Sequence, residues 1–253
     1  MLLVLMFAQP FSVQKHASAK APAPNAPIWS KKGTTFPLAC PPPFTACQPL
    51  GIASPDGKNA LEVTYERFGT DAGDIEAAAL KLRVAGKYAG PLAVHEAVDY
   101  EIVWSPDSRC FFINSNYNGY MDEIADVYCV DQSNSALTRI MQQVEQDMSR
   151  SFPPCRAAYI SEEQCAQMTA DPGSNLSVVG LDWIHGSCQM VVMAEVPCDS
   201  LWGGIMCQVL GYEIAVPSGK ILRRMEPKEF AKEWQHSMAW KFHIPDPPEF
   251  KKH

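Results

Sequence analysis

Several features that define common protein classes are missing from this chain of 253 residues. No apolar run approaches the roughly 18–20 residues that a helix needs to cross a bilayer. Basic residues never form a run longer than two, and the formal net charge is −7. Nucleic acids and anionic membrane surfaces attract clustered lysine and arginine. We therefore expect no transmembrane segment, no nucleic-acid partner and no binding to an anionic membrane surface.

The sequence also lacks the usual patterns of catalytic and metal sites. It contains no G-x-S-x-G nucleophile elbow and no set of four cysteines and histidines at zinc-finger spacing. His185 lies beside Ser187 and Cys188, but this cluster falls in a predicted turn, where a structural role is the simpler interpretation. We therefore assign no catalytic residue, no metal site and no cofactor, and we leave open whether the protein is an enzyme.

What is present is the composition of an ordinary globular protein, with 47% hydrophobic and 19% charged residues. The apolar start Met1–Ala8 and the Ala17-Ser-Ala19 site predict a signal peptide over residues 1–19. A buried N-terminal strand is the alternative. Residues 20–50 are expected to form a proline-rich leader that is flexible up to about Pro37. Residues 51–253 then form a single domain.

Nine cysteines agree with export, because disulfides persist outside the cytosol. Two stretches resemble each other: in each, a tryptophan precedes a cysteine, and a second cysteine follows nineteen positions later. The repeat predicts two disulfides, Cys110–Cys129 and Cys188–Cys207. Closeness in sequence predicts two more, Cys40–Cys47 and Cys155–Cys165. Cys198 is then left over, and Cys198–Cys207 is a rival to Cys188–Cys207, because connectivity does not follow from sequence.

Hydrophobic periodicity predicts strands at 60–66, 79–85, 100–104, 109–114, 124–130, 177–183, 188–195 and 206–216. Helical spacing predicts helices at 140–148, 161–168 and 227–236, the second capped by Ser161 and the third begun by Pro227. The chain thus divides into units 51–98, 99–152 and 175–240, with an insert at 153–174.

Val103–Ile113 reads VWSPDSRCFFI, and Ser54–Lys58 reads SPDGK. These segments resemble the repeat of TolB-type β-propellers, and Trp183–Ser187 resembles it weakly. The resemblance implies strand-turn-strand geometry and no functional residue. With about three units, where a closed propeller needs at least four, we expect an α+β, β-rich fold. It would consist of three blade-like antiparallel units, two of them followed by a helix, in an incomplete propeller or curved sheet.

A hairpin tip rich in asparagine and tyrosine is the best candidate for a binding loop. Its residues are Asn114, Asn116, Tyr117, Asn118, Tyr120 and Asp122. The spacing mimics a calcium loop, but the leading ligands are neutral and Ala125 stands where a bidentate glutamate is needed. A polar hairpin tip is therefore the preferred interpretation, and such tips also serve as recognition surfaces.

Our first functional hypothesis is a periplasmic or secreted, disulfide-stabilised module that is not an enzyme and binds an unknown protein or small ligand. An envelope hydrolase with an unrecognised site is the first alternative. A homo-oligomer subunit that completes its sheet by dimerising, with Cys198 as an intermolecular thiol, is the second.

Overall fold

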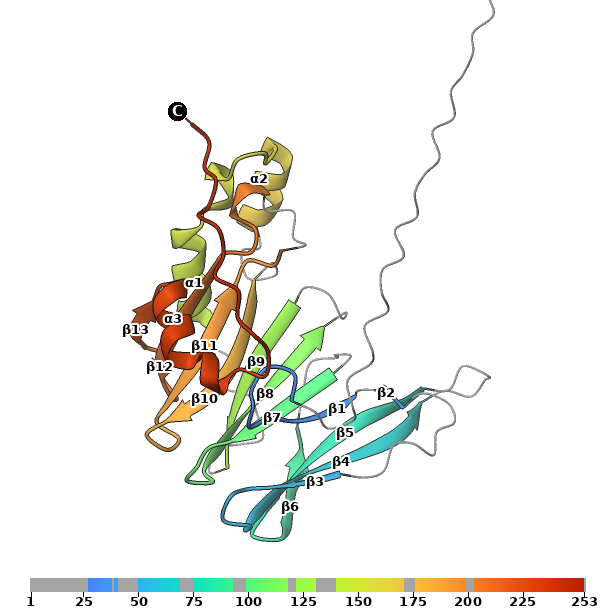
Figure 1. The fold of residues 1–253 in the computed structure, drawn as a ribbon. Coiled ribbons are helices and arrows are strands. Elements are labelled where there is room, and N and C mark those ends of the chain that lie inside the picture. The colour runs from blue at the N-terminus through green and yellow to red at the C-terminus, as the bar shows by residue number, and fades with distance from the viewer. Residues whose placement is uncertain are drawn as a thin grey trace, which may run out of the picture.

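The computed structural model describes residues 27–37, 39–40, 50–68, 75–92, 99–117, 122–130, 140–170, 176–198 and 203–252. These residues form three antiparallel sheets that lie side by side, with helices gathered around the third (Figure 1). The expected α+β, β-rich fold class is confirmed, and the second and third sheets are each followed by a helix.

Each sheet is built mainly from consecutive strands. The first contains β2 (Ala39–Cys40), β3 (Leu50–Ala53), β4 (Asn59–Phe68), β5 (Ile75–Val84) and β6 (Lys87–Pro91). The second contains β1 (Thr34–Pro37), β7 (Asp99–Trp104), β8 (Cys110–Tyr117) and β9 (Asp122–Cys129). The third contains β10 (Ser177–Ile184), β11 (Gln189–Glu195), β12 (Val209–Ala215) and β13 (Ile221–Met225). The helices are α1 (Gln142–Ser151), α2 (Glu162–Ala170) and α3 (Pro227–Trp234).

The second sheet is apolar on both faces, because it is the middle layer. Phe111 and Ile113 pack toward the first sheet with Leu61 and Leu80. Phe112, from the opposite face of the same strand, packs toward the third sheet. Alternating side chains of one strand point to opposite faces, so β8 contributes to both cores. Both Phe111 and Phe112 are 0% exposed.

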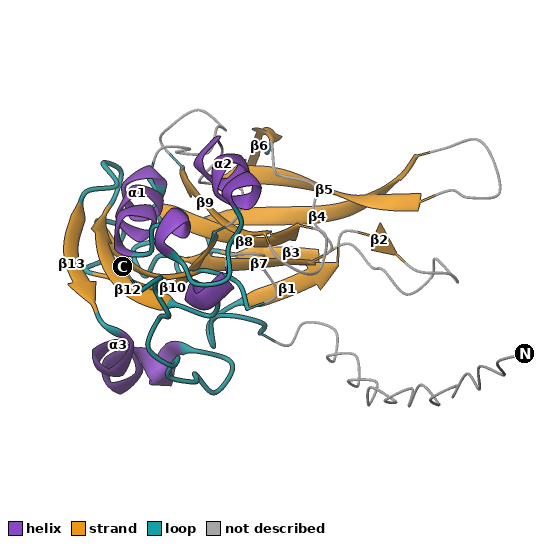
Figure 2. Cartoon of the chain, turned by 90° about the horizontal axis from the view of Figure 1, so that it is seen from above, coloured by secondary structure: helices purple, strands orange, loops and turns teal. Residues whose placement is uncertain are grey.

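The two outer layers end the stack in different ways. Alternate residues of the third sheet pack against Val144 of α1 on one face and Phe230 of α3 on the other. Figure 2 shows α1 and α3 on either side of this sheet. The outer face of the first sheet carries Glu62 and Arg83, which form an ion pair. Within the described part of the chain no fourth sheet closes a ring.

The two helix starts predicted at Ser161 and Pro227 are present. The Ser161 hydroxyl accepts a hydrogen bond from the Gln164 backbone N–H at 3.1 Å, and the Gln164 side chain accepts one from the Ser161 N–H at 3.0 Å. This reciprocal pair is a capping box, which satisfies two backbone donors at the start of α2. Pro227 occupies the first turn of α3, where its missing N–H is harmless.

The expected flexible leader does not extend to Pro37. Trp29 is 3% exposed and Ser30 is 0% exposed. The buried carboxylate of Glu101 accepts hydrogen bonds from the backbone N–H groups of Ile28, Trp29 and Ser30 at 2.7–2.8 Å. Burial raises the pKa of Glu101, although these donors and Asn114 offset part of the effect. Composition alone suggested a flexible segment, but Trp29 and the Glu101 anchor make it part of the fold.

Three disulfides connect the described cysteines. Cys110–Cys129 and Cys155–Cys165 occur as expected, with Cα atoms 4.0 and 4.9 Å apart. The expected Cys188–Cys207 bridge is wrong: Cys207 pairs with its rival Cys198, and Cys188 is an exposed free thiol. The Cys40–Cys47 expectation lies outside the described residues, since Cys47 is not among them.

The reason for this correction is the length of one connection. In the second sheet only residues 118–121 separate β8 from β9, whereas residues 196–208 separate β11 from β12. Cys188 precedes β11 and Cys207 precedes the antiparallel β12. The two cysteines therefore lie at opposite ends of strands that span about 20 Å. The long connection instead turns back so that Cys198 meets Cys207.

Candidate functional site

Three equivalent turns, one from each sheet, lie next to one another. In the first two, a serine hydroxyl donates to the aspartate two residues later, Ser54 to Asp56 at 2.8 Å and Ser105 to Asp107 at 2.7 Å. The Asp56 backbone N–H donates to the Ser108 hydroxyl of the next turn at 3.0 Å. The Ser-Pro-Asp motif therefore shapes each turn and helps to join neighbouring sheets.

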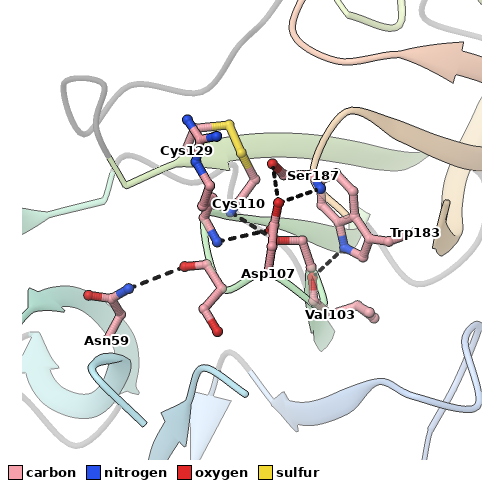
Figure 3. The surroundings of a disulfide bond; sticks show 10 residues. Asn59, Val103, Asp107, Cys110, Cys129, Trp183 and Ser187 are labelled. Atoms are coloured by element: carbon pink, nitrogen blue, oxygen red, sulfur yellow. Dashed lines mark hydrogen bonds between the residues drawn. A yellow bond between two sulfur atoms is a disulfide. The ribbon is translucent and has the colours of Figure 1, made fainter. Parts of the chain in front are cut away.

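Asp107 extends this row of turns to the third sheet (Figure 3). Its carboxylate accepts hydrogen bonds from the Ser187 N–H at 2.9 Å and from the Ser187 hydroxyl at 2.8 Å. Burial alone would raise the pKa of Asp107, but hydrogen bonds from Ser105, Ser187 and the Arg109 N–H hold it below its usual value. His185, in the same third turn, is exposed. Ser187 thus has a structural partner, and this turn is a junction between sheets.

The repeated tryptophans have equivalent roles in this junction. The Trp104 indole N–H donates to the carbonyl of Ile52 in the first sheet at 3.2 Å. The Trp183 indole N–H donates to the carbonyl of Val103 in the second sheet at 3.1 Å. Ile52 and Val103 each stand two residues before the serine of their turn. Each tryptophan therefore bonds to the same position of the preceding unit.

A cavity of about 160 Å³ lies beside this junction. It is lined by Arg109, Cys110, Cys129, Ser187, Cys188, Val216 and Pro217. The free cysteine Cys188 and the Cys110–Cys129 bridge thus line the same cavity. The preferred sequence pairing placed Cys188 in a disulfide, and only the rival Cys198–Cys207 pairing leaves Cys188 as a free thiol.

The proposed hairpin-tip binding loop needs one correction. Asn114 is 0% exposed and exchanges two hydrogen bonds with the backbone of Gly180, at 2.8 and 2.7 Å. It joins the second sheet to β10, the edge strand of the third, and is therefore structural. Asn118 and Tyr120 lie outside the described residues. So do the side chains of Asn116, Tyr117 and Asp122, whose backbones belong to β8 and β9.

A larger but shallow and open cleft, of about 570 Å³, lies at the C-terminal side of α3. Its lining residues are Lys31, Lys232, Gln235, His236, Met238, Ala239, Trp240 and Lys241. Three lysines and a histidine thus line one hollow, and no acidic residue of the described ranges is among its lining residues. On a chain of net charge −7, this gathering of basic groups is the best candidate for a functional site.

Two anchors build the cleft from distant parts of the chain. The backbone of residues 29–31 pairs with that of residues 237–239: the Lys31 N–H donates to Ser237 at 2.8 Å, and the Ala239 N–H donates to Trp29 at 2.9 Å. The Gln235 side chain donates to the Trp240 carbonyl and accepts from the Phe242 N–H, each at 2.7 Å. Lys31 and Lys241 are therefore held next to α3.

The basic side chains of the cleft are exposed and available. Lys232 and His236 are four residues apart along α3 and the turn after it, so they share one face. The His236 ring stacks on Trp234 with centroids 5.8 Å apart. The nearby acids Glu229 and Glu233 are instead bonded to Arg223. Among the described residues, none forms an ion pair with Lys31, Lys232 or Lys241.

Sequence reasoning missed this cleft because its members are scattered. Lys31 lay in the presumed leader, and Lys241 lay beyond the last predicted helix. The available signal was the four-residue spacing of Lys232 and His236 on the predicted helix at 227–236. By itself that spacing is typical of any solvated helix face.

No group of three or more histidine, cysteine, aspartate or glutamate side chains converges within the described ranges to hold a metal ion. The helices described are all too short or too polar to cross a membrane. Comparison of the chain with models of protein families, with curated proteins and with solved structures found no match.

Proposed function

We propose that this protein is an exported, disulfide-stabilised binding module whose cleft at α3 takes a small anionic ligand. The observation that carries the proposal is the convergence of Lys31, Lys232, Lys241 and His236 on one cleft, with no acidic side chain among its described lining residues. Three disulfides and the predicted signal peptide support export.

The chemistry of the lining indicates the kind of ligand. Lysine ammonium groups are compact charges that bind phosphate or carboxylate oxygens. The half-buried ring of Trp240 lines the same hollow and offers an apolar surface beside these charges. A ligand that carries a phosphate or carboxylate next to a ring or sugar would use both. Binding sites commonly combine a hydrophobic wall with a few polar groups in this way.

Phenyl phosphate is a suitable probe because it joins one phosphate to one ring. We expect saturable binding of this probe in isothermal titration calorimetry, and competition by inorganic phosphate. Phenol, which has the ring without the charge, should bind much more weakly. Binding should weaken as salt increases, because exposed charges are screened.

The matched variants are Lys232→Gln and Lys228→Gln. Both lysines are exposed residues of α3, but only Lys232 lines the cleft. We expect K232Q to weaken phenyl phosphate binding about two- to fivefold, the effect of losing one exposed ionic contact, and K228Q to leave it unchanged. Equal effects of the two variants would show that only net charge matters, and the proposed site would be wrong.

A further inference from the structure

Three sulfur-bearing residues line the cavity at the junction of the second and third turns. Cys110 and Cys129 join β8 to β9 as a disulfide, and Cys188 presents a free thiol to the same hollow. The cavity they share has a volume of about 160 Å³. The thiol and the bridge therefore face a common space.

The sheet register explains why Cys188 is there. The Val130 N–H donates to the carbonyl of Arg109, the residue before Cys110, at 2.8 Å. In the third sheet the Val216 N–H donates in the same way to the carbonyl of Cys188. Cys188 thus occupies the place of Arg109 in the next unit, one residue before its strand.

Contacts between the turns fix this position. Ser187, the neighbour of Cys188, is held by two hydrogen bonds to Asp107 of the second turn. Asp107 lies three residues before Cys110 (Figure 3). The junction that joins the two sheets therefore also positions Cys188 at the cavity that the disulfide lines.

We propose that these cysteines form a thiol–disulfide exchange site. The Cys188 thiolate attacks the sulfur of Cys129, which is half-buried, whereas Cys110 is 5% exposed. A Cys129–Cys188 bond forms, the Cys110–Cys129 bond breaks, and the Cys110 sulfur leaves as a thiolate that takes up a proton. One disulfide replaces another, so the step requires no oxidant or reductant.

The exchange changes what the bridge connects. Cys110–Cys129 ties two strands of one sheet, whereas Cys129–Cys188 ties the second sheet to the turn that opens β11 of the third. A covalent bond would then reinforce the contact that Asp107 and Ser187 make by hydrogen bonds. The same fold can therefore carry either of two disulfides, Cys110–Cys129 or Cys129–Cys188. The total number of disulfides is the same in both cases.

Disulfide mapping of the full-length oxidised protein tests this inference. Native protein is held at pH 8, denatured in acid, labelled with N-ethylmaleimide and digested without reductant. We expect the label to shift in part from Cys188 to Cys110, together with a peptide linked through Cys129–Cys188. The shift should be slower at pH 5, because only the thiolate attacks. Label on Cys188 alone at every time would overturn the proposal.

Two variants make the test independent of how far exchange proceeds. Cys110→Ser leaves Cys129 and Cys188 as two thiols, and we expect them to form a bridge within one chain on oxidation. Cys155→Ser is the control, because it leaves Cys165 and Cys188 unpaired on elements that do not share this cavity. An intact Cys198–Cys207 bridge reports that each variant has folded. If Cys129 and Cys188 in C110S stay reduced, or join only between chains, the proposal fails.

Discussion

Replacing Trp183 with phenylalanine tests how strongly the second and third sheets are coupled. Trp183 is 6% exposed, donates its indole N–H to the Val103 carbonyl and packs on Phe112 with ring centroids 5.6 Å apart. Phenylalanine keeps an aromatic ring in the core but removes the donor and part of the ring volume. The change therefore weakens the contact between the two units while keeping an aromatic side chain in the core.

The expected loss of stability follows from these contacts. A lost hydrogen bond costs about 0.5–1.5 kcal/mol, and a buried carbonyl left without a donor adds to this. The space vacated by the smaller ring costs about 1 kcal/mol more. W183F should therefore unfold with a free energy about 2–3 kcal/mol lower than that of the wild type.

Urea unfolding followed by far-ultraviolet circular dichroism measures this loss without using tryptophan fluorescence. The control is Trp104→Phe, because Trp104 makes the equivalent bond to Ile52 but is only half-buried. We expect W104F to lose about 1 kcal/mol, since water can partly replace an exposed bond. The reasoning would be refuted if W183F had the wild-type midpoint and slope, or if W104F were the more damaging change.

Three further changes have effects that the structure specifies. Asp107→Asn should remove part of the acid-induced loss of stability: the folded pKa of Asp107 lies below its unfolded value, so its contribution is present above about pH 4 and disappears as pH falls further. The free energy of unfolding, measured from pH 6 to pH 3, should fall more steeply in the wild type than in D107N. Asn114→Leu should cost about 2–4 kcal/mol in urea unfolding, because the N–H and C=O of Gly180 lose their partners. Gly211→Ala places a Cβ 2.1 Å from the fully buried Phe230 ring of α3. The melting temperature should therefore fall, with about 1–3 kcal/mol of stability lost. Phenyl phosphate binding should weaken as well, because α3 carries part of the cleft. Wild-type behaviour in any of these assays would contradict the contact concerned.

Local sequence patterns were sufficient to predict much of the fold. Alternation located β7 and β10 almost to the residue, and Ser161 and Pro227 marked the starts of α2 and α3. The Ser-Pro-Asp turns also formed as the motif suggests. These features depend on residues close in the chain, which is where period and turn chemistry act.

The places where the structure differs from the sequence predictions depend on packing between residues far apart in the chain. Equal cysteine spacing suggested equal hairpins, but a long connection in the third sheet moved Cys207 away from Cys188. The segment at Trp29 has the composition of a linker, yet Glu101 from a strand far along the chain binds its backbone. The cleft depends on that segment too, because Lys31 reaches α3 only when Trp29 is packed.

Nuclear magnetic resonance of the uniformly ¹⁵N-labelled protein tests the central claim, ligand binding at the α3 cleft, most directly. The six tryptophans each provide one indole N–H signal, and among the tryptophans that the structure describes only Trp240 lines the cleft. Titration with phenyl phosphate should shift the Trp240 indole signal and the His236 backbone amide signal in a saturable way, and the shifts should diminish in K232Q. Shifts confined to Trp104 or Trp183, or no saturable shift, would contradict binding at this cleft.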